Sequence, residues 1–212
     1  MSSVRYPKNI NNVIMEASSH GLSQNRLDGL LFNTGIFTNL SQDHLDYHKN
    51  TKNYLKAKLY LFEKLIKKSG NIITDEQIPE FKKIKNIATN KNLNLFSLLD
   101  KKNDFQFLSH QYQGESQLLE IKYKNSIHKI KLNLIGKVQF KNVLMAVITS
   151  IKSSINIKDI LSIIPKIKSV EGRFEKVGKI KNNSKVILDY AHTPDALKTC
   201  LKNIKEQFPT KN

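Results

Sequence analysis

The sequence has a single cysteine and no long apolar run. Cys200 has no second cysteine to pair with in this chain, so an intramolecular disulfide is excluded and a reducing compartment is indicated. No stretch has the length of a transmembrane helix or the pattern of a signal peptide. These absences argue against a secreted domain stabilised by disulfides and against a membrane protein. We therefore expect a cytoplasmic protein with no membrane partner.

Arginine is also scarce, although the formal net charge is +17. Arg5, Arg26 and Arg173 are the only arginines, and the other 32 of the 35 basic residues are lysines spread along the whole chain. Surfaces that bind nucleic acid more often cluster their basic residues, include arginine and interleave aromatic side chains. The lysine excess therefore indicates a compositional bias of the source, and we expect no nucleic-acid partner.

The first half of the chain predicts a parallel sheet with helical connections. Residues 13–17 have the pattern of a buried strand, and residues 34–40 and 71–74 have the pattern of two more. A helix is predicted over residues 51–68, and strands joined through connections of this length suit a parallel sheet. A weak further strand is predicted at residues 87–88.

The second half predicts an antiparallel portion and then a new unit. Residues 105–134 alternate apolar and polar side chains in pieces, as antiparallel strands do. The remaining pattern predicts helices over 138–150 and 157–167, strands over 174–180 and 185–190, and a helix that starts at Pro194 with Thr193 as its cap. With 212 residues the chain can form one or two domains, and we place a boundary near residue 170.

A polar cluster interrupts the pattern after the strand that ends near Thr38. The sequence FTNLSQDHLDYH, at residues 37–48, carries Asn39, Asp43 and His44 between this strand and the helix that follows. Ligands of α/β proteins usually bind at such a junction of strand end and helix start. A solvated loop with a capped helix is the plainer interpretation of the same residues.

Three further motifs favour the ligand-binding interpretation. They are MEASSHG at residues 15–21, EGRFE at residues 171–175 and DYAHTPD at residues 189–195. Together with the polar cluster they resemble the Mur ligases, in the right order from residue 13 to residue 201. The resemblance is nearest to the branch that adds the third amino acid to UDP-N-acetylmuramoyl-L-alanyl-D-glutamate in peptidoglycan synthesis. Several separated motifs that agree are a stronger signal than one short pattern.

The resemblance implies an α/β fold made of two incomplete domains. Residues 12–170 would be part of the central ATP-binding domain, a mostly parallel sheet with flanking helices and a small antiparallel portion. Residues 171–212 would be the start of the Rossmann-like C-terminal domain. Residues 1–11 are polar and we expect a disordered start.

The implied activity is ATP-dependent formation of an amide bond. Such a ligase moves the γ-phosphoryl group of ATP to a substrate carboxylate, and an amine then attacks the acyl phosphate. The implied cofactors are ATP and Mg²⁺, and the implied partners are UDP-N-acetylmuramoyl-dipeptide and an amino acid, either meso-diaminopimelate or L-lysine.

The metal site implied by the resemblance consists of Glu16, His44 and Lys58. Glu16 and His44 would hold a magnesium ion near the γ-phosphate. Lys58 matches the family lysine that carbon dioxide carbamylates, which turns a cation into a carboxylate-like ligand. Lys56 lies on a different face of the helix and should not replace it. Outside the family context, Glu16 and Lys58 would be ordinary surface residues.

The substrate and nucleotide residues follow from the same resemblance. Ser18, Gln24 and Arg26 match positions that hold the UDP-muramoyl-dipeptide, and Asn39 and Asp43 have lesser roles at that site. For the nucleotide, the matching residues are Asn142 (adenine), Arg173 (the hinge arginine), Asp189 (ribose) and, with a looser role, His192.

One motif of the family is missing. No G-x-x-x-x-G-K-[ST] phosphate loop occurs in the 212 residues, and no counterpart of the UDP-binding amino-terminal domain is readable. We therefore expect an internal piece of a ligase. Two alternatives stay open: an inactive remnant that acts as a binding module, and a ligase similar to folylpolyglutamate synthetase.

The missing loop generates a prediction about the chain by itself. Phosphoryl transfer needs the backbone that cradles the β- and γ-phosphates, so the 212-residue chain should not turn over ATP. Phosphate release with UDP-muramoyl-dipeptide and an amine present should equal that of a sample without protein. Substrate-dependent release would contradict the expectation of an incomplete ligase.

Overall fold

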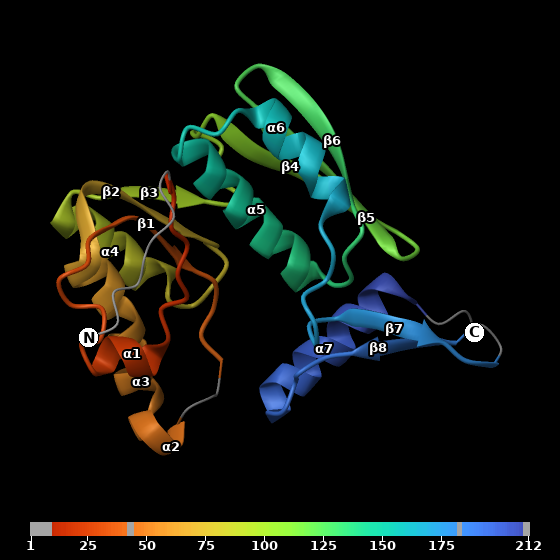
Figure 1. Cartoon of the computed structure of the whole chain (residues 1–212), viewed down its shortest axis with the longest axis horizontal. Helices are drawn as coiled ribbons and strands as arrows, with labels where there is room; N and C mark the ends of the chain where they lie inside the picture. Colours follow the sequence, from red (N-terminus) through yellow and green to blue (C-terminus); the bar gives the residue numbers. More distant parts are fainter. Residues whose placement is uncertain (1–9, 42–44, 182–183, 210–212) are drawn as a thin grey trace.

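The computed structural model of the chain describes residues 10–41, 45–181 and 184–209. Figure 1 shows its elements, which are α1 (Ser19–Ser23), β1 (Phe32–Phe37), α2 (Leu45–His48), α3 (Thr51–Tyr60), a π-helical turn (Leu61–Leu65), β2 (Ile66–Thr74), α4 (Phe81–Lys91), β3 (Asn94–Ser97), β4 (Phe105–Gln113), β5 (Ser116–Tyr123), β6 (Ser126–Leu132), α5 (Lys137–Lys152), α6 (Ile157–Ile163), a 3₁₀ turn (Ile164–Lys166), β7 (Glu175–Lys179), β8 (Lys185–Leu188) and α7 (Pro194–Gln207).

Sheet A contains three parallel strands in the order β1-β2-β3. Successive side chains of a strand point to opposite faces, and both faces of β2 are buried. Ile72 packs with residues of α3 and α4 on one face, and Ile73 joins the core that contains α5 on the other. Gly35 of β1 allows the close approach of Phe62, because a Cβ at Gly35 would lie 2.8 Å from its ring. Sheet A is therefore the middle layer between two helical layers.

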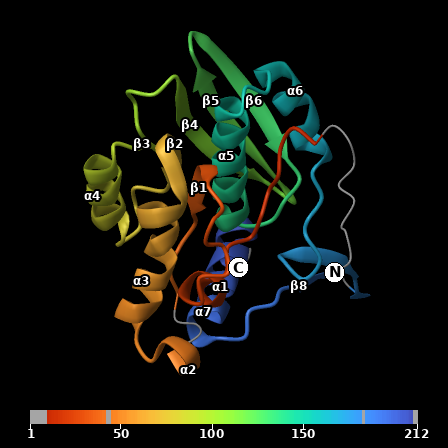
Figure 2. The same cartoon turned by 60° about the vertical axis from the view of Figure 1, so that its left-hand side comes forward.

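Sheet B contains the antiparallel strands β4-β5-β6. Helix α5 runs between sheet A and sheet B (Figure 2). The largest core cluster joins α5 to both sheets through Ile73 of β2, Leu119 of β5, and Phe140 and Leu144 of α5. The two sheets share no strand in the described part of the chain, so α5 is the element that packs them together.

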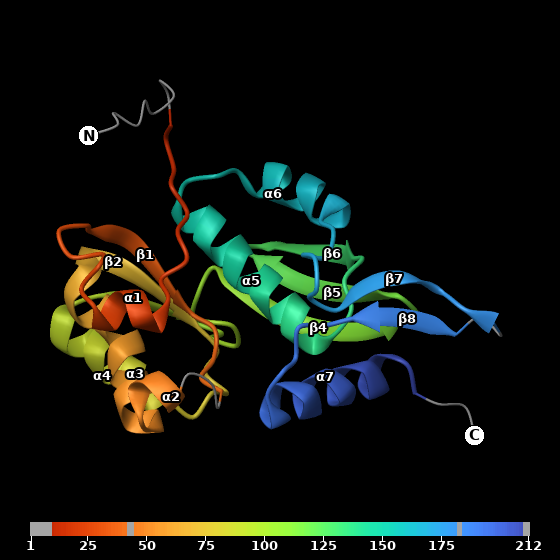
Figure 3. The same ribbon diagram turned by 60° about the horizontal axis from the view of Figure 1, so that its bottom comes forward.

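The last unit consists of β7, β8 and α7. β7 and β8 form an antiparallel pair, which we call sheet C, and α7 lies beside it (Figure 3). Thr193 caps α7 as expected, since its Oγ1 accepts from the N–H of Ala196 at 3.3 Å. A small core of Ile135, Phe174 and Cys200 joins this unit to the segment before α5.

The expected α/β class with a parallel sheet and an antiparallel portion is confirmed. Three local predictions were wrong. The helix expected over residues 51–68 ends at Leu65, because β2 already begins at Ile66 and pairs with β1 there. Residues 13–17 form no strand and extend away from sheet A (Figure 3), because a strand needs a hydrogen-bonded neighbour and β1 pairs only with β2 among the described strands. Residues 87–88 lie inside α4, where they belong to its apolar face. The expected disordered start falls mostly on residues 1–9, outside the described residues.

The segment before α1, residues 10–18, exposes apolar side chains. Val13 is 75% exposed and Ile14 is 97% exposed. None of the described helices combines the length and apolar character needed to span a bilayer.

Exposed apolar residues beside an open strand edge favour association between chains. We expect the purified chain to self-associate in a concentration-dependent way in size-exclusion chromatography. Replacing Val13 and Ile14 by lysine should shift the population towards the monomer. The matched control is Ile127→Lys, at a position on β6 that is 64% exposed, which should leave the elution profile unchanged. A cooperative, monomeric wild-type chain would contradict this prediction.

Candidate functional site

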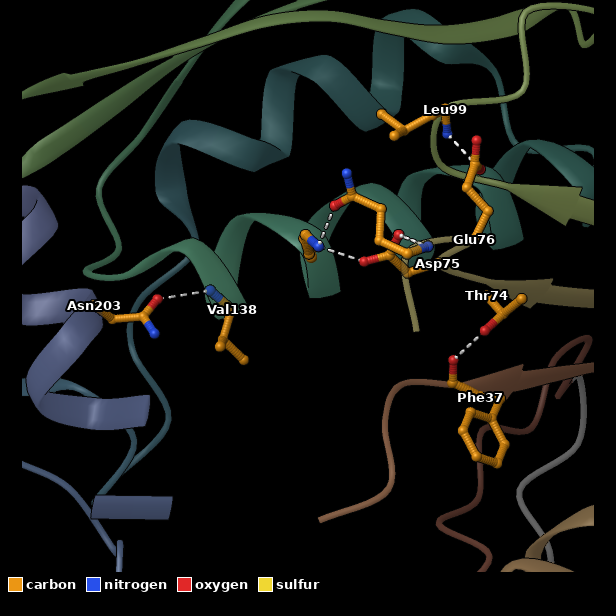
Figure 4. Close-up of polar contacts among 9 residues, drawn as sticks. Phe37, Thr74, Asp75, Glu76, Leu99, Val138 and Asn203 are labelled. Atoms are coloured by element: carbon orange, nitrogen blue, oxygen red, sulfur yellow. Dashed lines mark hydrogen bonds and ion pairs between the residues drawn. The ribbon is translucent and has the colours of Figure 1, made fainter. Parts of the chain in front are cut away.

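The carboxyl ends of β1, β2 and β3 meet at one edge of sheet A. This edge is the usual ligand-binding side of an open parallel sheet. Phe37 ends β1 and Thr74 ends β2, and the Thr74 hydroxyl donates to the Phe37 carbonyl at 2.8 Å (Figure 4). The two strand ends are thereby held in register where the chain leaves the sheet.

Asp75 follows β2 directly and is buried at this edge. The Lys141 ammonium of α5 forms an ion pair with its carboxylate and also donates to the side-chain oxygen of Gln77 at 3.1 Å. The Gln77 N–H donates to Asp75 Oδ1 at 3.0 Å. The pair therefore ties α5 to the edge of sheet A.

Lys58 reaches the same edge from α3. Its ammonium donates to the Asn39 carbonyl at 2.8 Å and lies 5.3 Å from the ring centroids of Phe37 and of Tyr54. Lys56 is exposed, whereas Lys58 is partly buried. Of these two lysines, the structure brings Lys58 to the end of β1.

The residues expected to hold the muramoyl substrate lie around α1. The hydroxyl of Ser18 caps this helix by accepting from the Gly21 N–H at 3.1 Å. The Gln24 amide donates to the phenol oxygen of Tyr47 at 3.0 Å, and the Ser23 hydroxyl donates to the same oxygen at 3.1 Å. These two hydrogen bonds and the charge of Arg26 lower the pKa of Tyr47, with the Ser23 bond having the largest effect.

A histidine joins this group to α3. His48 is buried, and its Nε2 lies 3.0 Å from the hydroxyl of Ser19. The His48 ring stacks on Tyr54 at a centroid distance of 5.0 Å, and its centroid lies 5.4 Å from that of His20. A chain of contacts therefore runs from α1 through His48 and Tyr54 to Lys58.

The expected metal ligands are only partly described. Glu16 is exposed in the extended segment before α1. His44 and Asp43 lie outside the described residues. Within the described ranges, no group of three or more His, Cys, Asp or Glu side chains could hold a metal ion. A carboxylate at Glu16 and a carbamate at Lys58 would offer the oxygen ligands that Mg²⁺ prefers.

The residues expected to bind the nucleotide, Arg173, Asp189 and His192, form a second polar group. The Arg173 guanidinium lies 5.0 Å from the ring centroid of Tyr190, and His192 Nδ1 lies 3.0 Å from the Tyr190 carbonyl. Both oxygens of Asp189 accept backbone N–H groups, from Phe174 and from Ala191, each at 3.0 Å. Asp189 therefore joins the segment before β7 to the segment after β8, and Arg173 and His192 both contact Tyr190 there.

Helix α5 touches this second group through Gln139. The Gln139 amide donates to the Arg173 carbonyl at 3.3 Å. Asn142 is exposed and lies three residues further along α5, on the same side of the helix as Gln139. The structure thus brings together Arg173, Asp189 and His192, with Gln139 as the contact to α5.

Several residues near α1 and at the edge of sheet A were missed by the sequence analysis. Tyr47 and His48 contact residues more than 20 positions away, which no local pattern shows. Of these residues, Asp75 had the clearest signal in the sequence, because a carboxylate directly after a strand end indicates a ligand-binding edge. Nothing in the sequence distinguishes Lys141 from the other lysines.

Comparison with known proteins assigns both parts of the chain. Residues 2–150 match the family described as Mur ligase middle domain, and residues 172–212 match Mur ligase, glutamate ligase domain. The UDP-N-acetylmuramoyl-L-alanyl-D-glutamate–2,6-diaminopimelate ligase of Zymomonas mobilis is 34% identical over 92% of this chain and 40% of its own length. This chain thus spans about 40% of the curated relative that it matches.

Solved structures show the same fold. A structure of a UDP-N-acetylmuramoyl-L-alanyl-D-glutamate–2,6-diaminopimelate ligase superposes with a TM-score of 0.70 at 26% identity, covering 89% of this chain and 39% of that chain. The MurF ligase of Thermotoga maritima in complex with ADP gives a TM-score of 0.68 at 18% identity, covering 92% and 43% of the two chains.

The ion pair at the sheet edge yields a stability prediction. Lys141→Met leaves a buried carboxylate without its cation, which should lower the free energy of unfolding by about 3–5 kcal/mol in a urea titration. The double variant Asp75→Asn/Lys141→Met removes both charges and should recover most of that loss.

The matched control is Lys176→Met, which breaks the half-exposed ion pair with Glu115. It should cost less than about 1 kcal/mol, because exposed pairs are screened by solvent. Equal losses for Lys141→Met and Lys176→Met would show that water screens Asp75 as well.

Proposed function

Because this chain belongs to the Mur ligase family, we propose that it forms part of an ATP-dependent ligase that extends UDP-N-acetylmuramoyl-L-alanyl-D-glutamate by one amino acid. The name of the Zymomonas mobilis relative favours meso-diaminopimelate over L-lysine as that amino acid. The ligase would act in the cytoplasm, in peptidoglycan synthesis.

One observation carries the proposal. Lys58, the residue that matches the carbamylated lysine of the family, lies at the carboxyl edge of a parallel sheet and donates to Asn39 at the end of β1. The nearby Lys56 is exposed on the same helix. The position of Lys58 suits a residue that is modified to act on a ligand at that edge.

The two polar groups divide the substrates between them. Ser18, Gln24 and Arg26 bind the muramoyl-dipeptide near α1, and Asn39 and Asp43 have lesser roles in binding it. Asn142, Arg173, Asp189 and His192 bind the nucleotide beside the hinge. Arginine is suited to carboxylate and phosphate oxygens, because its donors form a planar fork.

Magnesium would be held by Glu16, His44 and the carbamate of Lys58. The fit rests on donor chemistry, since a carboxylate and a carbamate supply hard oxygen ligands. When bound, the ion neutralises charge on the transferring phosphoryl group. The residues of this chain hold the substrate carboxylate and the nucleotide in line for the transfer.

The reaction then needs no covalent nucleophile from the protein. A carboxylate oxygen of the dipeptide substrate attacks the γ-phosphorus of ATP, and ADP leaves. The amine nitrogen of the incoming amino acid attacks the acyl carbon, phosphate leaves and the amine loses a proton. Positioning and charge stabilisation are the main contributions of such an enzyme.

A chimaeric ligase tests the proposal. This chain replaces the corresponding segment of the Zymomonas mobilis relative, so that the segments of the relative on either side are retained. We expect phosphate release that depends on UDP-muramoyl-dipeptide and on diaminopimelate together. In this chimaera, Lys58→Ala should lower turnover on the order of a hundredfold, because a metal ligand is lost.

Three controls sharpen the Lys58 test. Lys56→Ala should keep the turnover of the parent chimaera. Added acetate should partly restore the Lys58→Ala variant, because the missing group is a carboxylate, whereas added amines should not. Normal turnover of Lys58→Ala, or rescue by amines, would argue against carbamylation. An inactive parent chimaera would favour the remnant that only binds.

A further inference from the structure

Helix α5 begins without a cap from its own segment. The first N–H groups of a helix have no partner within the helix, and a Ser, Thr, Asp or Asn at the N-cap usually accepts from one of them. The N-cap of α5 is Gly136, which has no side chain and adopts φ 90°. Acceptors for this helix start must come from elsewhere in the protein.

Two amides of α7 supply them. The side-chain oxygen of Gln207 accepts from the Gly136 N–H at 2.7 Å. The side-chain oxygen of Asn203 accepts from the Val138 N–H at 3.2 Å (Figure 4). Asn203 and Gln207 are 5% and 3% exposed, so water does not compete strongly for these hydrogen bonds.

The amide nitrogens of the same two residues are also bonded. Asn203 Nδ2 donates to the Thr199 carbonyl within α7 at 2.8 Å, and Gln207 Nε2 donates to the Gly114 carbonyl at 3.1 Å. Gly114 lies in the turn between β4 and β5. The donors and acceptors are therefore satisfied on both sides, which fixes the orientation of each amide.

Gly136 is required for this arrangement. A Cβ at Gly136 would lie 3.3 Å from both the Cβ and the Oδ1 of Asn203, and its positive φ disfavours other residues. Gly136 has no side chain with which to cap α5. For the same reason it lets α7 approach closely enough to cap the helix.

The capped turn is the part of α5 that faces the hinge. Gln139 of this turn donates to the Arg173 carbonyl, and Asn142 follows on the same side of the helix. We infer that Asn203 and Gln207 are positioning residues, which cap α5 from the C-terminal unit and thereby hold the nucleotide-facing turn in place. The functional part of this inference rests on the proposed function; the capping itself does not.

Hydrogen exchange tests the capping on the 212-residue chain. In the double variant Asn203→Ala/Gln207→Ala, amides of residues 136–142 should exchange about tenfold faster, because both caps of the helix start are lost. Amides of β2 should exchange at the wild-type rate. The exposed control Lys202→Ala, on the same helix, should leave residues 136–142 unchanged.

A conservative variant separates capping from simple loss of packing. Asn203→Asp keeps the acceptor oxygen, and a carboxylate is favoured at a helix N-terminus, so protection of residues 136–142 should be close to that of the wild type. Unchanged exchange in the double alanine variant would overturn the inference. Loss of protection throughout the chain, β2 included, would overturn it as well, because the amides would then support the whole fold.

Kinetics of the active chimaera test the positioning role. The double alanine variant should raise the KM for ATP about tenfold and keep the KM for UDP-muramoyl-dipeptide within about twofold. An unchanged KM for ATP in an active enzyme would remove the positioning role. If the parent chimaera is inactive while the exchange result holds, the proposed function fails and the capping by α7 stands.

Discussion

The burial of α5 is the constraint on which the rest of the structure depends. Sheets A and B share no strand among the described residues, and the largest core cluster joins both of them to this helix. Phe140, Leu144 and Ile148 are buried, and each such side chain contributes about 1.5–3 kcal/mol when it leaves water. A helix with apolar residues on more than one face needs a partner on each side. The two sheets provide those partners, so α5 has one position in the fold.

The position of α5 in turn determines how the two polar groups are related. Lys141 is tied to Asp75 at the edge of sheet A, where Lys58 and Asn39 also lie. Two residues earlier, Gln139 contacts the carbonyl of Arg173. One helical turn therefore contacts both the edge of sheet A and the segment that contains Arg173. Because a packed helix transmits displacement along its axis, a shift of α5 would move both contacts together.

The features of this arrangement that depend on local sequence could be predicted. The features that depend on contacts between distant segments could not. The antiparallel portion and the start of α7 at Pro194 follow from alternation and from cap chemistry. An apolar run such as residues 13–17 predicts a strand only if another strand is beside it. The contacts between Gln24 and Tyr47 and between Lys141 and Asp75 join distant positions. The family motifs supplied the candidate site residues, whereas these contacts required the fold.

The contacts around α5 differ in strength, which decides what can move. Asp75 is buried in its ion pair with Lys141, and leaving a buried charge without its partner costs about 3–5 kcal/mol. The caps from Asn203 and Gln207 are hydrogen bonds between neutral groups, each with a net contribution of about 1 kcal/mol. The half-exposed pair of Glu115 with Lys176 adds about 1 kcal/mol or less. A displacement of the C-terminal unit would therefore break the caps and the Glu115–Lys176 pair before the Lys141–Asp75 pair, and would leave α5 attached to sheet A. Helix α5 would therefore stay with the sheets, and a movement of α7 would act on the first turn of α5.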